Sequence, residues 1–89
     1  MKIMKNSVAG SLESSDVLVS VSPSGGEDNT VYVESIVMKQ FGERIRSVAR
    51  EELSRMGVSG ADVKIQDRGA LECTLRARLE TALERAAGR

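Results

Sequence analysis

The stretch DVLVSVSPS, residues 16–24, decides the fold class, because an apolar side chain recurs at every second position along it. Val17, Val19 and Val21 lie on one face of an extended chain, and the residues between them lie on the other. This period of two is typical of a half-buried β-strand and differs from the period of 3.6 of an amphipathic helix. The stretch therefore predicts a strand and argues against a fold made only of helices.

A weaker strand precedes this stretch, with Val8, Gly10 and Leu12 on a common face. The four residues Glu13–Asp16 separate the two strands, and the side chains of Ser and Asp hydrogen-bond the backbone well in turns. We therefore predict a hairpin with two adjacent serines at its exposed tip.

The chain that follows contains a loop and two further strands. Residues 22–29 hold one proline and two glycines but no apolar residue, which indicates a loop. The stretch TVYVES, residues 30–35, alternates as a short third strand. A fourth strand within residues 60–69 places Val63 and Ile65 inward.

Two segments change to helical spacing, with apolar residues at steps of three and four. In the first these residues are Val37, Phe41, Ile45, Val48, Ala49, Leu53 and Met56. In the second they are Leu71, Leu75, Leu79, Ala82, Leu83 and Ala86. Ser35 is a suitable N-cap for the first helix, and Gly57 can end it.

These patterns predict an α+β fold in the order β-β-β-α-β-α. A small antiparallel or mixed sheet of about four strands packs against two amphipathic helices. Because 89 residues give room for one core only, we assign residues 1–89 to a single domain.

Composition excludes several classes of function. Thirteen basic side chains balance thirteen acidic ones, so the chain lacks the strong positive field of a nucleic-acid-binding protein. No apolar run reaches the roughly 18 residues of a membrane span, and the N-terminus lacks the apolar core of a secretory signal, so we expect a cytoplasmic protein. The chain has no histidine and one cysteine, Cys73, so we expect no metal site, no internal disulfide and no histidine-dependent nucleophile.

Ser14 and Ser15, which lie between Glu13 and Asp16, allow two interpretations. They form an ordinary polar turn, which the local sequence alone favours, or they present a hydroxyl for covalent modification. Because the chain lacks the usual general base, another enzyme would have to carry out such a modification.

Two other segments are candidate binding sites. GVSG, residues 57–60, has the spacing of the GxxG loop of KH RNA-binding modules, but no Lys or Arg lies between its glycines. Two glycines are also expected where a helix ends and a turn follows. SGGE, residues 24–27, lacks the frame of a phosphate-binding loop and is interpreted as a turn.

The arginines of the second helix are a further candidate. They form either a basic strip that recognises phosphate or carboxylate, or a solvated face with pairs such as Glu72 with Arg76. The strip consists of Arg76, Arg78 and Arg85 of that helix, with Arg68 nearby. Cys73 is interpreted as a small buried or edge residue rather than a reactive thiol.

Three segments carry a resemblance to a known family. They are SVAGSLESSDVLVSVSP (residues 7–23), KQFGERIRSV (39–48) and QDRGALECTLRARLETAL (66–83), and they span nearly the whole chain in order. Together they resemble the acyl carrier protein of citrate lyase, the small gamma subunit of that enzyme.

The resemblance implies a site of covalent attachment. In that family the serine of a LESGD stretch carries 2'-(5''-phosphoribosyl)-3'-dephospho-coenzyme A through a phosphodiester. The matching stretch here is LESSD, residues 12–16, so Ser14 is the implied attachment residue and Ser15, which replaces the usual glycine, is the alternative. The flanking acids Glu13 and Asp16 would steer the tip toward basic partner surfaces.

The implied function is that of a noncatalytic carrier. It would move acetyl and citryl thioesters between the alpha (transferase) and beta (lyase) subunits while citrate is cleaved to acetate and oxaloacetate. A prosthetic-group transferase, the holo-carrier synthase, would load it, and neither nucleic acid nor membrane is an expected partner. The alternatives are the carrier subunit of malonate decarboxylase and a small α+β module that binds protein or RNA.

Overall fold

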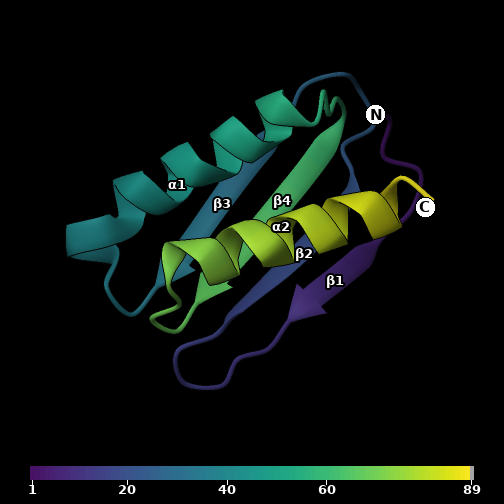
Figure 1. The fold of residues 1–89 in the computed structure, drawn as a ribbon. Coiled ribbons are helices and arrows are strands. Elements are labelled where there is room, and N and C mark those ends of the chain that lie inside the picture. Colours follow the sequence, from purple (N-terminus) through teal and green to yellow (C-terminus); the bar gives the residue numbers. More distant parts are fainter. Residues whose placement is uncertain (89) are drawn as a thin grey trace.

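A four-stranded sheet and two helices make up the fold, and both helices lie on the same face of the sheet (Figure 1). The structure is a computed structural model and describes residues 1–88, so Arg89, the last residue of the predicted domain, lies outside the described residues. In chain order the elements are β1 (Ser7–Gly10), β2 (Val17–Pro23), β3 (Thr30–Ser35), α1 (Met38–Arg55), β4 (Ala61–Asp67) and α2 (Glu72–Ala86). The predicted α+β class and the order β-β-β-α-β-α are confirmed.

The sheet is mixed, with the strand order β1-β2-β4-β3. Strand β2 pairs antiparallel with β1 and with β4, whereas β3 runs parallel to β4. A parallel pair needs a crossover connection, and α1 supplies it. Because Asp67 lies opposite both Val17 and Ser35, the start of β2 and the ends of β3 and β4 meet at one end of the sheet.

The alternating valines of β2 face the helices, as predicted. Val17 and Val19 are fully buried, and Val19 lies opposite Ile65 of β4, which is also fully buried. Leu79 and Leu83 of α2 are buried in the same core. Burying a side chain of this size contributes about 1.5–3 kcal/mol, so these layers hold α2 against the sheet.

The face predicted for the first strand is wrong. Val8 is 56% exposed and Leu12 lies beyond the end of β1, while Ala9 is buried. The cause is the pairing: Ala9 lies opposite the buried Val19, and directly paired residues share one face of a sheet. Ala9, the small residue, therefore faces the core and Val8 faces outward.

The predicted start of the first helix differs from the structure, and the first residues of both apolar stripes lie outside the core. Val37 is the N-cap of α1, because Ser35 is the last residue of β3 and its hydroxyl donates to Asp67 Oδ2 at 2.7 Å. Phe41 and Leu71, predicted within the apolar stripes, are 52% and 71% exposed. Both residues lie near the start of a helix. They keep the spacing of the apolar stripe, but the core does not extend as far as these positions.

Neither helix among residues 1–88 has the length and the continuous apolar character that crossing a bilayer requires.

Candidate functional site

The loop between β1 and β2 holds the serine pair at one end of the molecule (Figure 1). The backbone N–H of Asp16 donates to the carbonyl of Glu13 at 3.1 Å, which closes a four-residue turn with Ser14 and Ser15 at its centre. Both serines are exposed. The prediction of a polar turn with an exposed serine pair is confirmed.

Ser15 has a backbone conformation that favours glycine. Its φ is +63°, and among residues 1–88 it is the one non-glycine residue with a positive φ. A positive φ at the third position is typical of a type II turn. For a residue with a Cβ atom this conformation costs roughly 1–2 kcal/mol. The turn therefore keeps a shape suited to glycine, and Ser15 bears the strain.

Two backbone hydrogen bonds join this turn to the segment after β4. The N–H of Ser15 donates to the carbonyl of Arg68 at 2.8 Å, and the N–H of Arg68 donates to the carbonyl of Asp16 at 2.9 Å. They continue the pairing of β2 with β4, since Val17 lies opposite Asp67. Ser14 lies one residue beyond this pairing, so the turn presents it at the end of a fixed backbone.

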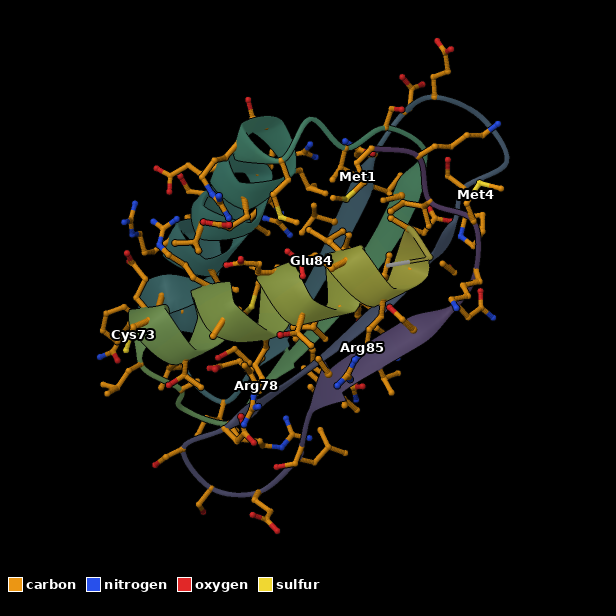
Figure 2. All side chains as sticks on the ribbon, turned by 45° about the vertical axis from the view of Figure 1, so that its right-hand side comes forward. Met1, Met4, Cys73, Arg78, Glu84 and Arg85 are labelled. Carbon is orange, nitrogen blue, oxygen red and sulfur yellow. The ribbon has the colours of Figure 1, made fainter. Side chains whose placement is uncertain are left out.

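The carboxylate of Asp16 holds the base of the loop. It accepts bonds from the hydroxyl of Ser11 and the N–H of Val17, both at 2.7 Å, and from two guanidinium nitrogens of Arg78 at 3.2 Å. These donors, Ser11 first, lower the pKa of Asp16 to about 2. Figure 2 shows Arg78 reaching from α2 toward this loop. Asp16 thus ties the loop to α2, and the steering of partners by Glu13 and Asp16 stays a prediction.

Gly10 sets the path of the chain into the loop. Its φ is +92°, and a Cβ atom at this position would lie 1.8 Å from the carbonyl oxygen of Val17. That oxygen accepts the N–H of Ser11 at 3.2 Å. Sequence analysis missed the roles of Gly10 and Ser11, and the signal that it could have used is a glycine at the end of a strand.

The arginines of the predicted basic strip are paired within the chain. Arg76 donates to Glu51 at 2.9 Å, to Glu52 at 3.0 Å and to Glu72 at 3.2 Å, and these bonds, with Glu51 first, raise the pKa of Arg76. The other contacts are Arg78 with Asp16, Arg85 with the carbonyl of Val8, and Arg68 with Glu34. The alternative of a solvated, internally paired face, including the Glu72–Arg76 pair, is confirmed.

The GVSG loop is occupied by the chain's own backbone. All four N–H groups from Gly57 to Gly60 donate to carbonyls of the chain, those of Ser54, Leu53, Met1 and Glu27 in that order. Gly57 follows the end of α1 with a φ of +63°, as predicted. The loop therefore fastens the end of α1 to the rest of the fold and has no backbone N–H left for a nucleic-acid backbone.

Cys73 and the SGGE stretch are surface features. Cys73 lies in the first turn of α2 and is exposed, so the buried position that the sequence allowed is wrong (Figure 2). Ser24 accepts the N–H of Gly26 and donates to the carbonyl of Asp28, so the stretch is a turn, as predicted.

Comparison with known proteins places the chain in a family. The family model described as malonate decarboxylase delta subunit (MdcD) matches residues 4–86. The chain is 49% identical over 88 residues to the citrate lyase acyl carrier protein of Albidiferax ferrireducens, across 99% of this chain and 90% of that protein. It is 53% identical over 87 residues to the citrate lyase acyl carrier protein of Streptococcus mutans, across 98% of this chain and 85% of that protein.

The fold also occurs in a solved structure. One chain of a Pseudomonas malonate decarboxylase hetero-tetramer in complex with malonate superposes with a TM-score of 0.73 at 20% identity, across 92% of this chain and 84% of that chain. The matched sequence includes the serine turn and both helices. The chain therefore belongs to the citrate lyase acyl carrier protein family, whose members are noncatalytic carriers that work with partner subunits through a covalently attached prosthetic group.

Proposed function

We propose that this chain is the acyl carrier subunit of a citrate lyase and that Ser14 is joined through a phosphodiester to 2'-(5''-phosphoribosyl)-3'-dephospho-coenzyme A. The observation that carries the proposal is the exposed Ser14 at the centre of a turn whose next residue is hydrogen-bonded to Arg68. The partners are the alpha and beta subunits of the lyase and a prosthetic-group transferase. The protein acts in the cytoplasm, and residues 1–89 act as one carrier domain.

The turn suits a bulky substituent on Ser14 better than one on Ser15. Ser14 is exposed and lies outside the backbone pairing with Arg68. Ser15 donates its N–H to Arg68 and already has a strained φ of +63°. A large group on Ser15 would therefore act directly on the residue that fixes the turn.

The chain's own residues position the attachment point. The Asp16–Arg78 pair and the two bonds to Arg68 fix the turn on α2 and on the end of β4. When bound, the prosthetic group supplies the thiol that carries acetyl and citryl groups between the alpha and beta subunits. A chain without histidine suits this division of labour, because the partner subunits supply the catalytic groups.

Tethering has a quantitative advantage. An acyl group on a flexible arm reaches the active site of a bound partner at an effective concentration on the order of millimolar. This value is set by the arm and does not depend on the concentration of the protein in solution. The gain requires an attachment residue that partners can approach, and the exposed end of the β1–β2 loop meets this requirement.

Intact mass and peptide mapping test the proposal. The chain is produced together with the lyase subunits and the modifying enzymes, as wild type, Ser14→Ala and Ser15→Ala. We expect the mass of the prosthetic group on the peptide that contains Ser14 in the wild type and in Ser15→Ala, and no such mass in Ser14→Ala. Loading of Ser14→Ala but not of Ser15→Ala would move the site to Ser15. An unmodified wild-type chain would overturn the carrier proposal.

The carrier subunit of malonate decarboxylase is the second candidate. The description of the matching family model and the fold of the Pseudomonas chain favour it. The two candidates differ in the reaction that the loaded chain restores. We expect it to restore citrate cleavage by carrier-free citrate lyase subunits; restored malonate decarboxylation instead would select the second candidate.

A further inference from the structure

We infer that the cavity between the N-terminal ends of α1 and α2 is a docking site for the prosthetic arm on Ser14, an inference that rests on the proposed function. The cavity has a volume of about 400 Å³, within the range of roughly 300–1,000 Å³ of small-molecule sites. Its apolar lining comes from α1, from α2 and from the segment between β4 and α2. The main lining residues are Phe41, Ile45, Val48, Ala70, Leu71 and Leu75.

The cavity lies a short way along the chain from the serine turn. Ser15 donates to the carbonyl of Arg68 at 2.8 Å, and the three residues that follow Arg68, which are 69–71, line the cavity. Standard chain dimensions place the Cα atom of Ala70 at most about 17 Å from that of Ser14. An arm long enough to reach the active site of another subunit is long enough to fold back over this distance.

The two lining residues that follow Arg68, Gly69 and Ala70, are small. A Cβ atom added to Gly69 would meet one side chain within 4 Å, at 3.7 Å from Ile36 Cδ1. Ala70, the next residue, is half-buried against the core. Beyond Arg68, the cavity wall at Gly69 therefore leaves room for an arm to lie along it.

The chemistry of the walls fits an arm of this class. Such an arm carries methyl and methylene groups between its amides, so it gains from an apolar lining with polar groups at the mouth. Phe41 and Leu71 supply exposed apolar surface at the mouth. Arg44 bonds Glu72 through two contacts of 2.8 and 3.0 Å, so a charged pair that is itself part of the lining joins the two helices.

The alternative occupant is an apolar side chain of a partner subunit. The arm is favoured because its attachment turn is hydrogen-bonded to Arg68, the residue just before the cavity-lining residues 69–71, so the arm competes at a high effective concentration. A docked arm would be withdrawn from water while the carrier is free and released when a partner offers a better site.

Methyl NMR spectra of the loaded and unloaded chains test the docking. Ile45, Val48 and Leu75 line the cavity and are buried, so a group in solution would leave their resonances unchanged. We expect their methyl signals to shift when Ser14 is loaded, while those of Val8, which lies on the exposed side of β1, stay in place.

The alkylation rate of the arm thiol gives a second readout. All variants carry Cys73→Ser, since that exposed thiol would also react. A thiol that is docked for about three-quarters of the time reacts about fourfold more slowly than a free one. We expect Phe41→Ser with Leu71→Ser to remove this protection and Tyr32→Ser, an exposed residue of β3 outside the cavity, to keep it.

The outcomes separate the two levels of the argument. Loading of Ser14 without methyl shifts overturns the docking site and leaves the proposed function intact. Shifts that appear only after the lyase subunits are added would identify a partner side chain as the occupant and also overturn it. A chain that is never loaded on Ser14 overturns the attachment proposal and the docking site together.

Discussion

Replacement of Gly10 by alanine should destabilise the protein more than replacement of any glycine in the 25–26 loop. A Cβ atom at Gly10 would lie 1.8 Å from the carbonyl oxygen of Val17, and the φ of Gly10 is +92°. The left-handed conformation costs roughly 1–2 kcal/mol for alanine. Displacing the Val17 carbonyl also weakens its bond with Ser11, which adds about 0.5–1.5 kcal/mol. We expect a total loss of about 1.5–3.5 kcal/mol.

Two control variants separate the conformational cost of a positive φ from the cost of the clash with the Val17 carbonyl. Gly25 has a φ of +85° with no atom within 4 Å of an added Cβ, so Gly25→Ala carries the conformational cost without the clash. Gly26 also has open space around an added Cβ, and its φ lies outside the range that favours glycine, so Gly26→Ala should change the free energy of unfolding by less than about 0.5 kcal/mol.

Urea denaturation followed by circular dichroism measures the loss in free energy of unfolding for each of the three variants. An 89-residue protein has a total stability of about 4–13 kcal/mol, so Gly10→Ala should move the midpoint well outside experimental error. If Gly10→Ala and Gly25→Ala lost the same free energy within about 0.5 kcal/mol, the carbonyl clash would not govern this position and the reasoning would be refuted.

Three further predictions concern the turn and the charged groups. Ser15→Gly should relieve the positive φ and raise the free energy of unfolding by up to about 1 kcal/mol in urea titrations, while loading at Ser14 is retained. The pKa of Asp16 falls from 3.8 to about 2 on folding, so its stabilisation is present above pH 3.8 and is lost as the pH falls toward 2; Asp16→Asn should flatten the stability curve in this window. Glu52 is 4% exposed and accepts bonds from Arg55 and Arg76, so Glu52→Gln should cost about 1–3 kcal/mol in thermal or urea unfolding, and an unchanged midpoint would contradict this.

The strand and helix pattern was readable from the sequence where one face of an element is buried. The valines of β2 alternate because the helices cover that face along the whole strand. The pattern failed in β1, where Ala9 faces the core and the larger Val8 faces outward. Pairing with β2 fixes that face, and no local property of the four residues reports it.

The turn could be predicted, but its supports could not. An exposed serine pair follows from the polar residues 13–16 alone. The bond between Asp16 and Arg78 joins residues 62 positions apart, and the bond from Ser15 to Arg68 depends on the register of β2 with β4. Phe41 and Leu71 show what periodicity alone leaves open. They belong to the apolar stripes but are exposed, because the spacing of a stripe does not reveal where the core ends.

The position of Ser14 next to the central strands has a mechanical consequence. Tension applied to a group on this residue passes through Asp16 into β2 and, through the two backbone bonds of Arg68, into β4. These strands are the two inner members of the sheet, whereas β1 is a four-residue edge strand. A pull on the attached group is thus shared by two strands that are each hydrogen-bonded on both sides, so we expect the arm, and not the protein backbone, to move between partner sites.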